Sequence, residues 1–133
     1  MAPRILLDTN VLIRYLQEPR KLSREQLRLL DDSYRRNETI AISAITLLEV
    51  GRLVTEGRSR FQQTVESLMS ELQEDANLTV LPITFEIAAE SAKLIALRDP
   101  ADRAIVATAR VHRLKLLTSD QKIIDSKLAS VVA

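Results

Sequence analysis

Short apolar runs alternate with longer segments of helical period along the whole chain. The runs at 5–7, 39–42, 78–81, 115–117 and 131–132 have the length and apolar character of buried strands. The segments between them carry apolar residues at three- and four-residue spacing, bounded by capping residues and prolines. This alternation predicts an α/β fold with a parallel sheet of about four or five strands and helices on both faces.

The helix boundaries follow from capping signals and from apolar periodicity. Ser23 and Gln26 form a capping-box pattern, and Thr84 and Asp99 are suited to cap later helices, with Pro100 at a first helical position. The clearest amphipathic stripe predicts a helix over 59–75. Further helices are expected from about 11 to Pro19, over 24–36 and 44–57, from 85 to about 97, from 100 onward and over 120–127.

Length and composition bound the architecture and the chemistry. The 133 residues fit a single domain, residues 1–133, and the 46% hydrophobic content is enough to fill a core. The absence of cysteine and the single histidine exclude a disulfide scaffold, a thiolate zinc site and a multi-histidine metal site. No apolar stretch is long enough to cross a membrane, so we expect a cytoplasmic protein. The net charge of +1 permits a nucleic-acid partner without requiring one.

Acidic residues follow the predicted strands. Asp8 comes directly after the first strand, Asp120 follows the fourth, and Asp99 and Asp102 open a helix. Ligands of open parallel sheets bind at the carboxyl ends of the strands, where these acids are expected to meet. Taken singly, each aspartate is better explained as a helix cap than as a catalytic residue.

Glu49 does not fit the capping explanation, because it lies inside a predicted helix and within its apolar stripe. An ionised carboxylate in that setting needs a cation, either a neighbouring arginine such as Arg52 or a bound metal. Several convergent carboxylates repel one another, and a divalent cation removes this repulsion. Oxygen ligands suit Mg²⁺ or Mn²⁺, and such a site supports metal-assisted hydrolysis of a phosphodiester.

Four segments together resemble the PIN domain, and in particular the VapC-type ribonuclease toxins of toxin–antitoxin pairs. They are the segments at 6–13, 43–50, 99–105 and 117–120, so the resemblance covers nearly the whole chain. It implies a three-layer α/β/α sandwich and a site for Mg²⁺ or Mn²⁺ that cleaves RNA with an activated water. The residues that it implies are Asp8, Glu49, Asp102 and Asp120 as metal-binding and catalytic acids, and Asn10, Thr118 and Asp99 as supporting polar residues.

The resemblance also implies partners, namely an RNA substrate, a cognate antitoxin and a second copy in a homodimer. Two departures from the subgroup affect substrate details and the closeness of the assignment. Leu97 and Arg98 stand where many relatives carry a histidine, and Tyr15 and Leu48 stand near positions that often hold tryptophan.

Several basic residues are candidates for phosphate contacts. Arg14, Arg52 and Arg103 lie near the acids in sequence, although Arg52 or Arg103 could instead bridge a neighbouring acid. A basic stretch at 20–28 is more typical of a solvated helix face than of an RNA track. His112, late on a helix, is better placed to interact with the helix dipole than to act as a catalyst.

Two other functions remain open from the sequence. A phosphatase of the haloacid dehalogenase type also places an acid after its first strand, but it requires a second aspartate where this chain has Asn10. A binding module that keeps the fold without catalysis is the other alternative. The presence of all four matching acids argues against it.

Overall fold

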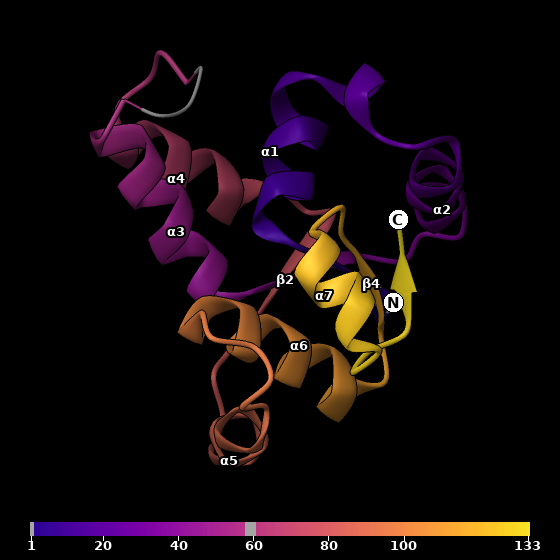
Figure 1. Cartoon of the computed structure of the whole chain (residues 1–133). Coiled ribbons are helices and arrows are strands. Elements are labelled where there is room, and N and C mark those ends of the chain that lie inside the picture. The colour runs from indigo at the N-terminus through magenta and orange to yellow at the C-terminus, as the bar shows by residue number, and fades with distance from the viewer. Residues whose placement is uncertain (1, 58–60) are drawn as a thin grey trace.

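A computed structural model describes residues 2–57 and 61–133. Its centre is a five-stranded, wholly parallel sheet with the strand order β3-β2-β1-β4-β5. The strands are β1 (Ile5–Leu7), β2 (Ile40–Ser43), β3 (Leu78–Leu81), β4 (Lys115–Leu117) and β5 (Val131–Val132). The predicted parallel α/β fold is therefore confirmed, and the strand count is five (Figure 1).

Helices connect the strands. They are α1 (Thr9–Gln17), α2 (Arg24–Arg35), α3 (Ala44–Thr55), α4 (Val65–Glu74), α5 (Phe85–Lys93), α6 (Pro100–His112) and α7 (Gln121–Ser126), with a short 3-10 turn at Pro19–Lys21. The residue before each of the seven helices accepts a hydrogen bond from a backbone N–H of the first turn. Nowhere in the described ranges is a helix long and apolar enough to cross a membrane.

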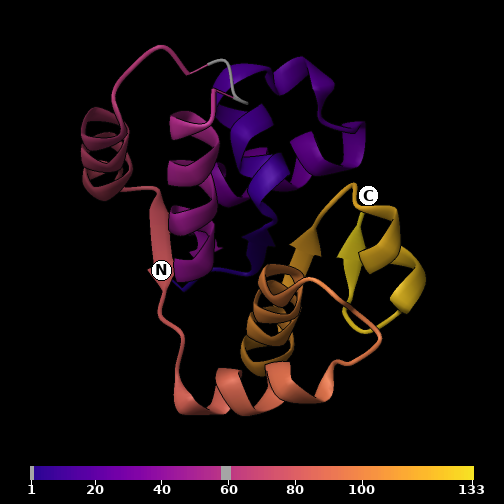
Figure 2. The ribbon, with the colours of Figure 1, turned by 60° about the vertical axis from the view of Figure 1, so that its left-hand side comes forward.

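The sheet has a separate apolar core on each face. Ile5, Leu7 and Ile42 pack into the core beneath α1, α2, α3 and α4. Leu6 and Leu116, which point to the opposite face, pack into the core formed with α5, α6 and α7. Figure 2 shows α1–α4 in the upper part of the view and α5–α6 in the lower part, with the strands between them. Together with the two cores, this is the predicted three-layer α/β/α sandwich.

Two predicted helices are shorter in the structure. The helix predicted over 59–75 begins only at Val65. The Thr64 side chain accepts a hydrogen bond from the Ser67 amide, and this N-cap fixes the amino end of the helix. Residues 59 and 60 lie outside the described part, and 61–64 are not helical. Phe61 still packs against the core, so its place in the apolar stripe reflects burial rather than helical structure.

The helix predicted to run from 85 to about 97 ends at Lys93. Leu94 leaves the helical conformation with a ψ of 55°, and the chain continues as a loop towards Asp99. Leu94 and Leu97 are both buried in the core shared with α5, α6 and α7. Their apolar spacing again reports burial rather than helix length.

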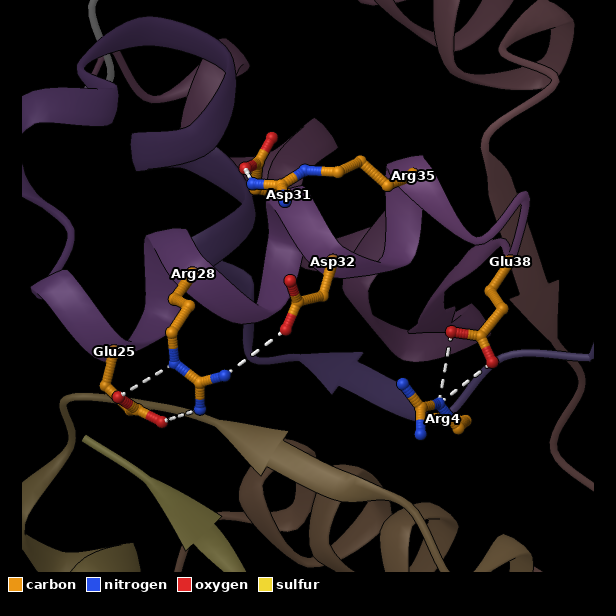
Figure 3. A network of polar contacts seen from close by, with 7 residues as sticks. All are labelled: Arg4, Glu25, Arg28, Asp31, Asp32, Arg35 and Glu38. Atoms are coloured by element: carbon orange, nitrogen blue, oxygen red, sulfur yellow. Dashed lines mark hydrogen bonds and ion pairs between the residues drawn. The ribbon is translucent and has the colours of Figure 1, made fainter.

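Two residues of the basic stretch on and before α2, Lys21 and Arg28, form local ion pairs. Arg28 binds Glu25 and, at 3.2 Å, Asp32, while Lys21 lies 3.2 Å from Glu18. Figure 3 shows the pairs on α2 together with the pair of Arg4 and Glu38, which lies beside it. Exposed pairs of this kind contribute little stability. They support the interpretation of this stretch as a solvated helix face.

Candidate functional site

The strand order reverses between β1 and β4, which places the carboxyl ends of these two strands beside the crevice where parallel sheets bind ligands. Asp8 directly follows β1, and its amide donates to the Leu117 carbonyl over 3.0 Å. Thr118 and Asp120 follow β4 at the same edge. The topology thus joins residues from the two ends of the chain.

A cavity of about 550 Å³ opens at this edge. Five acidic residues line it, namely Asp8, Glu49, Asp99, Asp102 and Asp120. They come from the ends of β1 and β4, from the middle of α3 and from the start of α6. The predicted convergence of these acids on one place is observed, and Asp99 is among them.

Asp8 is fixed in position by hydrogen bonds to both of its carboxylate oxygens. The Thr9 amide donates to Oδ1 over 2.8 Å, and the Thr118 hydroxyl donates to Oδ2 over 2.7 Å. The same hydroxyl accepts from the Asp120 amide at 3.0 Å, so Thr118 joins the two acids as predicted. Asp8 is only 5% exposed, and this burial raises the pKa of its carboxyl group. The two hydrogen bonds oppose that rise.

Glu49 lies on α3 and is half-buried. Its hydrogen-bond partner is the Thr9 hydroxyl, which donates to its Oε1 over 2.5 Å, and not the neighbouring Arg52. Arg52 lies instead 3.9 Å from Glu56, which is four residues further along the chain. Burial raises the pKa of Glu49, and the charges of Asp8 and Asp99 add to that rise.

A second threonine extends this arrangement. The Thr46 and Thr9 hydroxyl oxygens are 3.1 Å apart. Because the single hydroxyl proton of Thr9 is used on Glu49, Thr46 must be the donor to Thr9. Neither Thr9 nor Thr46 was expected to support the site. Thr9 adjoins Asp8, and Thr46 lies three residues before Glu49, on the same side of the helix, so helical spacing is the signal that could have found it.

Two of the other acids also act as helix caps. Asp99 accepts from the Ala101 amide at 2.8 Å, and Asp120 accepts from the Lys122 amide at 2.9 Å. Asp102, in the first turn of α6, accepts no hydrogen bond from any residue that the structure describes. Burial, followed by the charges of the other four acids, raises the pKa of Asp102 to about 7.

The chemistry of this set of donors fits a hard divalent cation, because every acidic side chain offers carboxylate oxygens and Asp102 has no hydrogen-bond partner among the described residues. Within residues 2–57 and 61–133, however, no three Asp, Glu or His side chains form a ready-made ligand set for one ion. Mg²⁺ usually binds to proteins through one or two carboxylates and keeps several waters, so it does not require such a set.

The other predicted residues divide into two groups. Asn10 and Arg52 line the cavity, although within the described chain Asn10 forms no hydrogen bond to the acids. Arg14 and Arg103 do not line it. Arg14 donates to the Ser119 hydroxyl over 3.1 Å, and Arg103 donates to the Leu97 carbonyl and so holds the loop before α6.

Two further cations, Arg98 and Lys122, line the cavity. Neither was expected there from the sequence. Arg98 immediately precedes Asp99, and Lys122 lies two residues after Asp120. Closeness to the acids in sequence could therefore have identified both.

Comparisons with known proteins agree with this architecture. Residues 5–127 match the family model of the PIN domain. The chain is 30% identical to Ribonuclease VapC22 of Mycobacterium tuberculosis over 121 residues. The aligned region covers 90% of this chain and 88% of that protein.

Solved structures with the same fold include a toxin–antitoxin complex from Klebsiella pneumoniae (TM-score 0.67, 25% identity, 97% of this chain and 96% of that chain). VapBC2 from Rickettsia felis, bound to a DNA fragment from its promoter, superposes with a TM-score of 0.73 at 17% identity, over 99% and 98% of the two chains. The family model spans almost the whole chain, and the relatives share its fold. The chain belongs to the PIN domain family.

Proposed function

We propose that this protein is a divalent-metal-dependent endoribonuclease of the VapC type, which hydrolyses RNA phosphodiester bonds with Mg²⁺ or Mn²⁺. The observation that carries the proposal is the cavity lined by five acids at the carboxyl edge of the sheet. The 30% identity to a ribonuclease over most of both chains supports the same activity.

In this proposal, Asp8, Glu49, Asp102 and Asp120 hold the metal and are the catalytic acids. The metal, when bound, supplies a water of lowered pKa and a positive charge against the phosphate. Thr118 and the Thr9 amide fix the orientation of Asp8, and the Thr9 hydroxyl fixes Glu49. In the absence of metal, Asp102 is protonated below about pH 7, and the metal must displace that proton.

We further propose a cognate antitoxin as the partner, a homodimer as the assembly and the cytoplasm as the location. The likeness to toxin–antitoxin complexes supports the antitoxin. Asn10, which stands where a haloacid dehalogenase phosphatase requires a second aspartate, argues against that alternative. The retention of every acid around the cavity argues against a catalytically silent binding module.

The test is cleavage of total RNA by the purified protein in Mg²⁺, in Mn²⁺ and in chelator, with the new RNA ends mapped. We expect cleavage only with a divalent cation, and its loss in Asp8→Asn and in Glu49→Gln. Asp31→Asn is the matched control, because it removes the same charge from an exposed ion pair on α2. Cleavage by Asp8→Asn at the wild-type rate, or persistence of cleavage in chelator, would show that this assignment is wrong.

A further inference from the structure

A shallow groove continues from the acidic cavity. It has a volume of about 670 Å³ and shares Glu49, Arg52, Arg98, Asp99 and Lys122 with that cavity. Beyond the shared residues it runs past Ile45 and Leu48 on α3 to the start of α6. The two hollows therefore form one continuous path along the surface.

Three cations from three different segments border this path. Arg52 lies on α3, Arg98 lies in the loop between α5 and α6, and Lys122 lies on α7. All three residues are exposed. They are the only basic residues that the structure describes in the lining of either hollow.

The side chains of Arg98 and Lys122 are available to a ligand. In the described ranges neither forms an ion pair or a hydrogen bond, although each lies close in sequence to an aspartate. Asp99 and Asp120 accept backbone N–H groups at the starts of α6 and α7 instead. Each of these two carboxylates thus uses Oδ1 as a helix cap and forms no ion pair with the adjacent cation in the described ranges.

The balance of charge makes this arrangement suitable for a polyanion. Five carboxylates alone repel a phosphate, but the three cations together with one divalent ion balance them. A nucleic-acid backbone that places one phosphate in the cavity must place its neighbouring phosphates outside it. Cations at the mouth and along the groove offer charge-assisted hydrogen bonds to those neighbours.

We propose that Arg98 and Lys122, aided by Arg52, bind the phosphates that flank the scissile phosphate, and that the RNA backbone leaves the cavity along this groove. The inference rests on the proposed ribonuclease function and specifies where its substrate lies. Arg14 and Arg103 are not part of this proposal, because neither lines the cavity or the groove.

The experiment measures binding separately from cleavage. A fluorescent single-stranded RNA oligonucleotide is titrated in Mg²⁺ with Asp8→Asn protein, alone and combined with Arg98→Gln, with Lys122→Gln or with both. Arg36→Gln is the control, because it removes the same charge from an exposed residue before the amino end of β2. The affinity is followed by anisotropy over a range of salt concentrations.

We expect the affinity to fall and the slope of log affinity against log salt to decrease by about 0.7 for each lost phosphate contact. The double variant Arg98→Gln/Lys122→Gln should lower the slope by about twice that amount. The Arg36→Gln control should have the same slope as the Asp8→Asn parent. For the variants without Asp8→Asn, KM should rise more than kcat falls.

Equal slopes in the double variant and the control would overturn the inference, as would an Asp8→Asn parent that binds no RNA.

Leu48, which is 71% exposed in the groove, also makes the groove a candidate contact between copies of the chain. Sedimentation of the same samples decides this. A change in association state without a change in RNA affinity would show that the groove is an interface and that the inference is wrong. Absence of RNA cleavage by the wild type would refute the proposed function, while the binding result would still decide the inference.

Discussion

Hydroxyl groups, rather than opposite charges, help to hold two acidic side chains of the cavity, Asp8 and Glu49, in place. Thr118 donates to Asp8, and Thr9 donates to Glu49. A hydroxyl orients a carboxylate without neutralising it, so each acid keeps its charge for a cation. An arginine in the same position would have formed an ion pair and removed that capacity.

The residue types of the site could be predicted from the sequence, but their hydrogen bonds could be predicted only in part. Asp8, Glu49, Asp102 and Asp120 were identified from their positions after strands and within a helix, and they do line one cavity. The support given by Thr118 was expected, whereas that of Thr9 and Thr46 was not. A threonine inside a helix usually faces solvent or its own backbone, and only the packing of α1 against α3 brings these two hydroxyls together.

The raised pKa of Asp102 predicts how stability depends on pH. Its pKa is about 7 in the folded protein and near 3.8 in the unfolded chain, so between these values the folded state holds a proton that the unfolded state has lost. The free energy of unfolding of the metal-free protein should therefore fall as the pH rises from 4 to 7. Asp8 and Glu49 contribute in the same direction because burial raises their pKa values too.

Urea unfolding in chelator at a series of pH values checks this prediction. Asp102→Asn should flatten the dependence and stabilise the protein by about 1–2 kcal/mol above pH 7, a figure reduced from the full shift because the side chain is half exposed. Asp31→Asn should leave the curve unchanged. Stability that rises between pH 5 and 8 in the wild type would contradict the electrostatic account of the cavity.

At the scale of the element, Asp99 has two effects at the start of α6. Its side chain accepts from the Ala101 amide, which makes it a cap, and its charge also raises the pKa of Asp102. Asp99→Ala removes both effects, whereas Asp99→Ser removes the charge and keeps an oxygen for the cap. The difference between the two variants therefore isolates the cap.

We expect Asp99→Ala to be less stable than Asp99→Ser by about 1 kcal/mol in thermal or urea unfolding at pH 8. The pKa of Asp102, measured by NMR titration, should fall in both variants because both lack the neighbouring charge. Equal stability of the two variants would mean that Asp99 influences the site through its charge alone.

The order and type of the elements could be predicted from the sequence, whereas two of their boundaries could not. β1 was recognised as a continuous apolar run, which is typical of a strand covered on both faces, and β2 was recognised from the alternation of Ile40 and Ile42. The boundaries near 61–64 and 94–97 were wrong for a common reason. Phe61, Leu94 and Leu97 pack into the cores from irregular backbone, and periodicity registers burial without specifying the backbone conformation that achieves it.

At the scale of the whole molecule, the cavity joins segments that are far apart in the sequence. The ends of β1 and β4 lie beside each other in the sheet, while α3 and α6 approach from opposite layers. Five repelling carboxylates at this junction oppose folding. An ion that binds there relieves the repulsion and links both layers of helices to the sheet.

Divalent cations should therefore stabilise the entire fold. At pH 8 the unfolding free energy should increase by about 2.7 kcal/mol at a cation concentration one hundred times the dissociation constant, because the unfolded chain lacks the assembled cavity. The effect should be much smaller at pH 5, where Asp102 is protonated and the ion must displace its proton. Thermal unfolding with increasing Mn²⁺ or Mg²⁺ measures both. Asp8→Asn and Asp102→Asn should lose the stabilisation. Asp31→Asn should retain it, since Asp31 lies outside the cavity. Equal stabilisation of all three variants would place the ion elsewhere on the protein.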